Sequence, residues 1–377
     1  MIYQLLKPLL FRLDAERAHD LVSALFGIVG RTPLAAAALR ALYAYEHPAL
    51  RVVCAGLPFH NPVGLAAGFD KRAALIGPMA LLGFGHLEAG TVTPRPQPGN
   101  PQPRMFRLPE DQALINRLGF NSPGLREVAT RLRASHHPLP GSQPTRIGPS
   151  GGRPPIVVGV NIGKNRDTPL ERATEDYAAA FVALAPLADY VTVNISSPNT
   201  PGLRQLHERA ALEELLGTLA GLNRAQAQPR PLLLKVSPDE TPAQLDQVVA
   251  VALEAGADGF VATNTTVGRA GLRGAARGEA GGLSGQPLTA RARAVIAHLA
   301  DATAGRLPVI GVGGVASAAD AYDHIRAGAT LVQLYTGMIY QGPGVVRSIK
   351  RGLVELLQRD GYREIGQAVG AGRHLTA

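Results

Sequence analysis

Residues 190–199, Tyr-Val-Thr-Val-Asn-Ile-Ser-Ser-Pro-Asn, show the pattern that decides the expected fold. A short apolar run ends abruptly in small polar residues. Buried strands of parallel sheets have this composition, because helices cover both faces of such sheets. The polar residues at the end of the run are the first candidates for a functional site.

Seven further runs of this kind alternate with amphipathic helical stretches from about Pro48 onward. The eight expected strands cover residues 62–67, 86–91, 156–161, 190–195, 232–236, 259–263, 308–311 and 331–335. Eight buried strands separated by helices are typical of a parallel barrel. The prediction is an α/β fold, a (β/α)8 TIM barrel over residues 46–360. A small N-terminal helical extension over residues 1–45 and a C-terminal tail over residues 361–377 complete the predicted division.

The composition narrows the class of protein. Of 377 residues, 46% are hydrophobic and 18% charged, which permits a large core and argues against global disorder. The single cysteine, Cys54, excludes an internal disulfide and any iron–sulfur cluster held by this chain alone. No metal site is expected in this chain, and no iron–sulfur subunit is expected as a partner. The net charge of +9 comes mainly from arginines that are scattered rather than clustered, so nucleic acid is not an expected partner. The many arginines also have an explanation unrelated to binding, which is the base composition of the genome.

Residues 1–45 carry apolar side chains at helical spacing. These are Leu5, Leu6, Leu9, Leu10 and Leu13, then Leu21, Leu25, Ile28 and Val29. Pro8 is expected to interrupt the first segment, Gly30 and Pro33 to close the second, and a third helix to cover residues 34–45. No secretory signal precedes them, and the longest apolar stretch is about half the roughly 20 residues of a bilayer span. The apolar faces either pack on the main domain or meet a membrane surface.

Polar side chains gather where the predicted strands end, which is where such barrels carry their active sites. Lys71, Lys164 and Lys235, three of the five lysines, lie at or just beyond strand ends. Six asparagines lie near the same ends or in adjacent loops: Asn116, Asn121, Asn161, Asn194, Asn199 and Asn264. Amides offer both a donor and an acceptor, which suits a ring with alternating C=O and N–H groups. The sequence predicts a cationic, amide-rich pocket.

Glycines follow the last two predicted strands. Residues 308–314 end in Gly-Val-Gly-Gly, Ser317 is expected to cap the next helix, and Tyr335-Thr336-Gly337 follows the eighth strand. Gly281–Gly285 could complete a phosphate cradle, since glycine lets backbone N–H groups approach closely. No G-x-G-x-x-G sequence opens a helix here, which favours a mononucleotide such as FMN over a dinucleotide.

One segment departs from the barrel pattern. Residues 134–155 are dense in Pro, Gly and Ser, which predicts a flexible surface loop. His136 and His137 lie in it and are expected to be solvated rather than to bind a metal.

Several long motifs resemble those of the dihydroorotate dehydrogenases. They are NPVGLAAGFDK (61–71), GTVTPRPQPGN (90–100), INRLGFN (115–121), NISSPNTPGLR (194–204), ATNTT (262–266) and GGLSGQP (281–287). The similarity runs from Met1 almost to Arg351, apart from the 134–155 loop. It implies FMN-dependent oxidation of dihydroorotate to orotate in pyrimidine (UMP) biosynthesis.

The resemblance also implies residue roles. Ser197 matches the catalytic base, Lys71 pairs with the substrate carboxylate, and Lys235 stabilises charge on the reduced flavin. The FMN positions are Ala66, Ala67, Gly68, Thr91, Asn161, Asn194, Lys235, Thr263, Gly285, Gly314, Tyr335 and Thr336. The substrate positions are Lys71, Asn116, Arg117, Leu118, Gly119, Phe120, Asn194, Asn199, Asn264 and Thr265. A proton leaves C5 to Ser197 while C6 delivers hydride to the flavin, although serine is a poor base and its proton relay is not evident.

Two features indicate the quinone-reducing class of the family. The base is serine where soluble classes use cysteine, and residues 11–19 resemble the helical cap of the quinone class. His19, Arg107 and Tyr335 match its quinone end, which implies a membrane quinone as partner. Peripheral attachment through residues 1–45 to the cytoplasmic side of a bacterial inner membrane is expected. The alternatives are another FMN barrel acting on dihydropyrimidine or dihydrouridine, or a catalytically silent barrel docked on a membrane.

Overall fold

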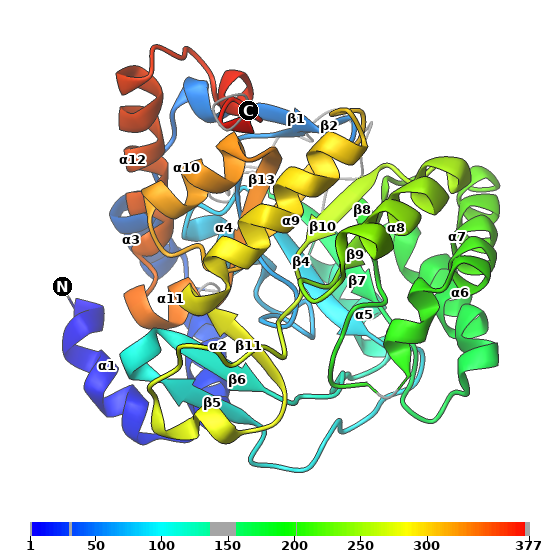
Figure 1. The fold of residues 1–377 in the computed structure, drawn as a ribbon. Coiled ribbons are helices and arrows are strands. Elements are labelled where there is room, and N and C mark those ends of the chain that lie inside the picture. The colour runs from blue at the N-terminus through cyan, green and yellow to red at the C-terminus, as the bar shows by residue number, and fades with distance from the viewer. Residues whose placement is uncertain (1, 30–31, 136–155, 201, 374–377) are drawn as a thin grey trace.

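Eight parallel strands close into a barrel in the order β10-β12-β13-β3-β4-β7-β8-β9 (Figure 1). The structure is a computed structural model that describes residues 2–29, 32–135, 156–200 and 202–373. The barrel strands are β3 (Val63–Leu65), β4 (His86–Val92), β7 (Val157–Ile162), β8 (Tyr190–Asn194), β9 (Leu232–Val236), β10 (Gly259–Ala262), β12 (Val309–Val312) and β13 (Ala329–Leu334). Each predicted strand overlaps one of them, and the predicted TIM barrel is confirmed.

Helices surround the barrel and bury one apolar face each. They are α4 (Ile76–Leu81), α5 (Leu125–Ala134), α6 (Ala173–Leu184), α7 (Arg209–Arg224), α8 (Pro242–Ala255), α9 (Thr289–Ala302), α10 (Ala318–Arg326), α11 (Thr336–Gln341) and α12 (Val345–Arg359). In α7 the buried Leu212, Leu215 and Leu219 recur at helical spacing. Ser317 caps α10 as expected, because its side chain accepts from the Asp320 N–H.

A hairpin that the sequence pattern did not predict closes the amino-terminal end of the barrel. Strands β1 (Val52–Cys54) and β2 (Leu57–Phe59) pair antiparallel. Their buried Cys54 and Phe59 pack in one cluster with Tyr190 and Leu331 from the barrel strands. Burial raises the pKa of the Cys54 thiol to about 12, so this cysteine is an inert core residue.

A second unpredicted element covers the opposite end. Strands β5 (Met105–Leu108), β6 (Ala113–Asn116) and β11 (Gly282–Gly285) form an antiparallel sheet in the order β11-β6-β5. Its strands come from insertions after β4 and after β10, so segments far apart in the sequence meet over the barrel. In Figure 1 this sheet lies at the end opposite the β1–β2 hairpin.

The extension consists of α1 (Ile2–Arg12), α2 (Ala15–Val29) and α3 (Pro33–Tyr43). Helices α1 and α2 lie beside the β5-β6-β11 sheet, whereas α3 contacts α4 (Figure 1). The expected break at Pro8 is wrong, because α1 runs through it. Contacts on both sides of Pro8 hold the helix: the Tyr3 hydroxyl donates to the Ile339 carbonyl, and the Phe11 ring meets Tyr340 with centroids 5.5 Å apart. Tertiary packing here outweighs the hydrogen bond that proline removes.

The outer faces of these three helices are apolar. Eight of the twelve large hydrophobic side chains exposed among the described residues belong to these helices, including Leu5 at 77% and Leu34 at 85% exposure, and a ninth, Leu13, lies between α1 and α2. Of the two interpretations, packing on the barrel accounts for only part of the apolar surface. Within the described ranges, no single helix is long and apolar enough to cross a membrane; α2 and α3 pass together by length and composition but meet at 112°.

The predicted C-terminal tail and the predicted 134–155 loop differ in how much of them the structure describes. Residues 361–373 pack on the barrel, with Ile365 and Ala368 fully buried and the Gly370 N–H donating to the Ile325 carbonyl. The predicted loop over residues 134–155 falls almost wholly on residues 136–155, which lie outside the described residues, as do His136 and His137.

Candidate active site

A cavity lies between the carboxyl ends of the barrel strands and the β5-β6-β11 sheet. Segments at the ends of seven of the eight barrel strands contribute to its wall. Most predicted site residues line it: Ala66, Ala67, Gly68, Lys71, Thr91, Asn116, Leu118, Gly119, Phe120, Asn194, Ser197, Asn199, Lys235, Thr263, Asn264, Thr265, Gly285, Gly314, Tyr335 and Thr336. Residues that are far apart in the sequence but follow strand ends therefore lie together in one cavity, as expected for the carboxyl end of such a barrel.

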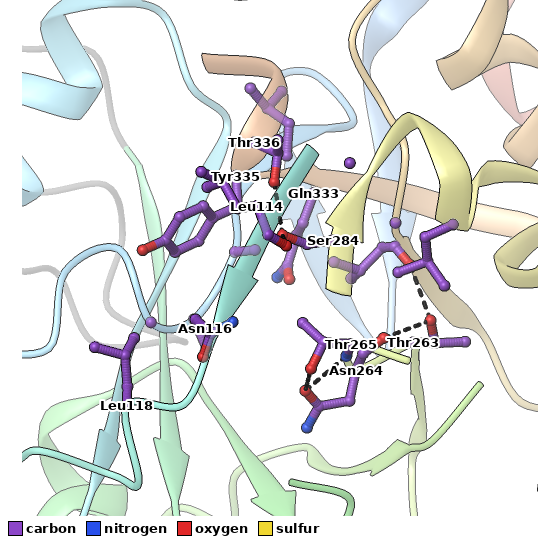
Figure 2. A pocket seen from close by; sticks show the side chains of 18 of the residues that line it. Leu114, Asn116, Leu118, Thr263, Asn264, Thr265, Ser284, Gln333, Tyr335 and Thr336 are labelled. Atoms are coloured by element: carbon purple, nitrogen blue, oxygen red, sulfur yellow. Dashed lines mark hydrogen bonds between the residues drawn. The ribbon is translucent and has the colours of Figure 1, made fainter. Parts of the chain in front are cut away.

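The inserted sheet supplies a wall that sequence reasoning partly missed. Figure 2 shows Leu114 and Asn116 of β6 across the cavity from the Thr263–Thr265 segment. Ser284 of β11 also lines the cavity, and its hydroxyl lies 2.9 Å from that of Thr336. Leu114 and Ser284 were not predicted, because their strands belong to no barrel repeat.

Buried amides form a connected network at the cavity. Asn264 Nδ2 donates to Asn194 Oδ1 at 3.2 Å, and Asn194 Nδ2 donates to Thr91 Oγ1 at 3.0 Å. Asn161 does not itself line the cavity; its Oδ1 accepts from Thr91 at 2.5 Å and from Asn194 at 3.1 Å. Asn161 therefore contacts the residues that line the cavity rather than the cavity itself.

Glu88 is the residue at the centre of this network that the sequence analysis missed. It lies on β4 with no solvent exposure, inside the barrel. Its carboxylate accepts from Asn161 Nδ2 at 2.7 Å, Thr192 Oγ1 at 3.1 Å and Gln333 Nε2 at 3.3 Å. An acidic residue within an apolar strand run was the available signal, because a buried carboxylate requires such partners.

Gln333 links the network to the cavity. Its side chain is fully buried and lines the cavity, while its Nε2 group is directed to Glu88 and to the Tyr190 hydroxyl. Its Oε1 has no hydrogen-bond partner among the described residues. Buried amide oxygens are rarely left unpaired, so this atom is suited to accept a hydrogen bond from a ligand or from a neighbouring cation.

Two buried lysines give the cavity its charge. Lys71 and Lys235 both line it, and burial lowers the pKa of each; for Lys71 the pKa falls to about 8. The described lining contains no aspartate, glutamate, histidine or arginine. Lys164, the third strand-end lysine, does not join them, because its ammonium donates to the Asn165 and Thr168 carbonyls. The cavity is therefore cationic through two lysines rather than three.

Ser197 lies in the loop after β8 and is 6% exposed. Among the described residues, the hydrogen bond to its Oγ comes from the Asn199 N–H at 3.3 Å. Asn199 in turn donates through Nδ2 to the Asn116 carbonyl at 3.1 Å, which ties the loop to β6. No cysteine lines the cavity within the described ranges, and Cys54 is at the other end of the barrel.

Gly285 and Gly314 line the cavity where β11 and β12 end, and neighbouring protein atoms leave no room for a side chain at either position. A Cβ on Gly314 would lie 1.9 Å from Thr289 Oγ1, and one on Gly285 would lie 2.4 Å from the Gln112 carbonyl oxygen. Both glycines have positive φ, 77° and 100°, which other residues rarely adopt. The N-terminus of α10 is occupied by its own cap, because Asp320 Oδ2 accepts from the Ala316 N–H.

The three residues predicted for the quinone end lie between the extension and the cavity. The His19 ring contacts Phe69 edge-on at 4.7 Å, and Phe69 contacts Tyr335, which lines the cavity, at 5.4 Å. Burial lowers the pKa of His19 to about 4, so its ring is neutral. Arg107 packs over the Phe11 ring at 4.7 Å and donates to the Leu13 carbonyl. Phe69 was not predicted, although it joins His19 to the cavity.

Arg117 is the predicted substrate residue whose side chain the structure places elsewhere. Its guanidinium pairs with Glu279 at 2.6 Å and donates to the Pro103 carbonyl, outside the cavity. The neighbouring Leu118, Gly119 and Phe120 do line the cavity. The alternation of side chains along this segment turns Arg117 outward.

A parallel barrel with a cationic, amide-lined cavity at its carboxyl end defines a barrel enzyme for anionic ligands. A family model described as dihydroorotate dehydrogenase matches residues 49–357. A relative named dihydroorotate dehydrogenase (quinone) from Roseiflexus castenholzii is 62% identical over 98% of this chain and 96% of its own length. A relative of the same name from Anaeromyxobacter sp. (strain Fw109-5) is 52% identical over 98% and 97%.

A solved structure agrees with these sequence relatives. DHODH from Eimeria tenella in complex with ferulenol is 37% identical, with a TM-score of 0.86 over 96% of this chain and 98% of that chain. The chain belongs to the dihydroorotate dehydrogenase family, a family of oxidoreductases. The family resemblance drawn from the motifs is thereby confirmed.

Proposed function

We propose that the chain oxidises dihydroorotate to orotate in pyrimidine biosynthesis, with bound FMN as first electron acceptor and a membrane quinone as the second. The charge of the cavity is the observation that carries this proposal. Two buried lysines without a carboxylate in the described lining favour anionic ligands. The substrate carboxylate and the negative charge of a reduced flavin are two such groups. The names of the relatives support the same substrate and acceptor.

The residues present fit a flavin mononucleotide. At Gly285 and Gly314 a side chain would clash with Gln112 and Thr289, so both positions require glycine. Their bare backbone can approach a phosphate, and the Thr336 hydroxyl also lines the cavity. Lys235, Thr263 and the unpaired Gln333 Oε1 supply the polar groups for a flavin ring. When bound, FMN supplies the acceptor for the hydride that leaves C6 of the substrate.

The other side of the cavity suits dihydroorotate. Lys71 can bind the carboxylate, while Asn116, Asn199 and Asn264 offer donors and acceptors to the ring amides. Ser197 takes the proton from C5, so that proton loss and hydride loss together yield the double bond of orotate. A neutral serine hydroxyl is a weak base, so Ser197 must pass its own proton to water as it accepts this one.

The extension provides the route to the quinone. The contacts from His19 through Phe69 to Tyr335 connect α2 with the cavity, and the exposed leucines of α1–α3 suit an apolar surface. Two electrons and two protons convert the quinone to its quinol and balance the oxidation of the substrate. We place the protein peripherally on the cytoplasmic side of a bacterial inner membrane, attached through residues 1–45.

Anaerobic mixing of the purified protein with dihydroorotate tests this function. The expected result is co-purified FMN whose visible absorbance is lost on mixing, because each dihydroorotate that is oxidised to orotate reduces one flavin. Added quinone should then restore the absorbance. Protein without flavin, or flavin that dihydroorotate leaves oxidised, would contradict the proposal.

A further inference from the structure

The first turn of α2 reaches the substrate side of the cavity. Ala15 is 8% exposed and packs in one buried cluster with Met105 and Leu118. Both of these partners line the cavity. The extension therefore supports the cavity wall directly, at a point away from the His19–Phe69 contact.

A buried ion pair joins the same turn to the barrel. Glu16 and Arg104 have side chains that are 13% and 8% exposed, with Nη2 and Oε1 2.6 Å apart. Arg104 Nε also donates to both carboxylate oxygens, at 3.0 and 3.2 Å. A two-pronged guanidinium–carboxylate pair fixes direction as well as distance. The pair therefore sets how α2 docks.

Arg104 also connects the first turn of α2 to the loop that lines the cavity. Its Nη1 donates to the Pro98 carbonyl at 2.5 Å and to the Asn100 carbonyl at 2.8 Å. The Asn100 N–H donates to the Leu118 carbonyl at 3.0 Å, and Asn100 Nδ2 donates to the Arg117 carbonyl at 2.9 Å. One guanidinium thus anchors the segment that holds the Asn116–Phe120 loop in place.

Glu16 also acts on Lys71 through its charge. Burial lowers the pKa of Lys71, and among the charged neighbours Glu16 opposes this most strongly, followed by Asp20 and Asp70. Arg104 acts in the other direction and lowers the pKa further. Loss of the Glu16 charge would leave Lys71 beside an unpaired guanidinium, which disfavours its protonated form.

We propose that Glu16 and Arg104 are positioning residues for the substrate side of the cavity, so that the extension is part of the dihydroorotate site as well as the quinone end. This inference rests on the proposed function. Glu16 holds the loop that contacts the substrate ring and keeps Lys71 cationic for its carboxylate. Docking of the extension and binding of substrate are then coupled.

The test compares full-length, flavin-loaded Glu16→Gln with wild type. Titration with orotate, followed by the change in flavin absorption, should show an orotate Kd about tenfold higher at pH 7, or about 1.4 kcal/mol. Arg17→Gln is the matched control, because Arg17 is an exposed neighbour on the same helix. It should leave the orotate Kd unchanged. The KM for quinone should also stay within about twofold of wild type in Arg17→Gln, because Arg17 takes no part in the ion pair that docks α2.

The pH profile separates positioning from a general loss of packing. In wild type the orotate Kd should rise as pH passes through about 8, where the Lys71 ammonium loses its proton. In Glu16→Gln the rise should begin at lower pH, whereas a purely structural defect would raise the Kd equally at every pH. If Glu16→Gln does not fold, Glu16→Asp and Arg104→Lys take its place, because both retain charge and lose the two-pronged geometry.

The outcomes are distinct. Wild-type protein that binds no orotate would contradict the proposed function itself. If wild type binds orotate and Glu16→Gln, or the two replacement variants, show the same orotate Kd and the same pH profile, the positioning role is overturned. The proposed function would then still stand.

Discussion

Replacement of Ser197 by alanine should separate stability from chemistry. The Ser197 hydroxyl is 6% exposed and accepts one long hydrogen bond, at 3.3 Å from the Asn199 N–H. Its removal should therefore lower the free energy of unfolding by about 1 kcal/mol or less. The described lining offers no carboxylate, histidine or cysteine as a substitute base. Loss of a positioned base costs roughly 10²- to 10⁴-fold in rate. Flavin reduction at pH 7 should slow by this factor, while the orotate Kd and the flavin content remain near wild type.

Anaerobic stopped-flow mixing with dihydroorotate, followed at the flavin band, measures this step without the quinone reaction. Ser197→Cys is the informative companion, because a thiol with a pKa of about 8.5 ionises in the accessible range. Its reduction rate should rise with pH where that of Ser197→Ala does not. Reduction of Ser197→Ala within about threefold of wild type at pH 7 would refute the assignment, since a base cannot be removed at so small a cost.

Two further predictions concern parts of the molecule outside the cavity lining. Glu88→Ala should lower the free energy of unfolding by about 3–5 kcal/mol, because the buried groups that donate to the carboxylate lose their acceptor. Glu355→Ala, on the exposed face of α12, is the control and should change the free energy of unfolding by less than about 0.5 kcal/mol. Thermal unfolding measures both variants, and equal melting temperatures would contradict the central place of Glu88. The double variant Leu9→Gln and Leu25→Gln should bind anionic lipid vesicles at least about tenfold more weakly, since each buried leucine contributes about 1.5–3 kcal/mol. The similarly exposed Val182→Gln on the barrel should bind like wild type, and vesicle sedimentation that shows no difference would remove the extension from membrane contact.

The repeating part of the fold could be predicted from the sequence, because each barrel strand is an apolar run and each covering helix has an apolar stripe. Strand ends also predicted most of the cavity, since parallel strands bring their carboxyl ends to one rim. The β1–β2 hairpin and the β5-β6-β11 sheet could not be predicted in this way. Their strands have only three or four residues, and β11 pairs with β6, which lies more than 160 residues earlier in the sequence.

Individual side chains were harder to place, and the reasons are local. Lys164 and Lys71 both follow strands, yet Lys164 bonds to carbonyls of its own loop while Lys71 turns inward. Arg117 lies in a cavity segment but points outward to Glu279. Pro8 predicted a break that packing of Tyr3 and Phe11 prevents. Each difference arises from a tertiary contact that spacing along the chain does not encode.

The carboxylates that most strongly support the two cavity lysines lie behind the cavity wall. Glu88 raises the pKa of Lys235 against burial, and Glu16 does the same for Lys71. Neither carboxylate lines the cavity. A carboxylate within the lining would pair with the lysines and compete with an anionic substrate for them. From behind the cavity wall, each carboxylate favours the protonated form of its lysine and leaves the ammonium group available to an anionic ligand. Because one support belongs to the barrel and the other to α2, the positive charge of the cavity is fully supported only when the extension is docked.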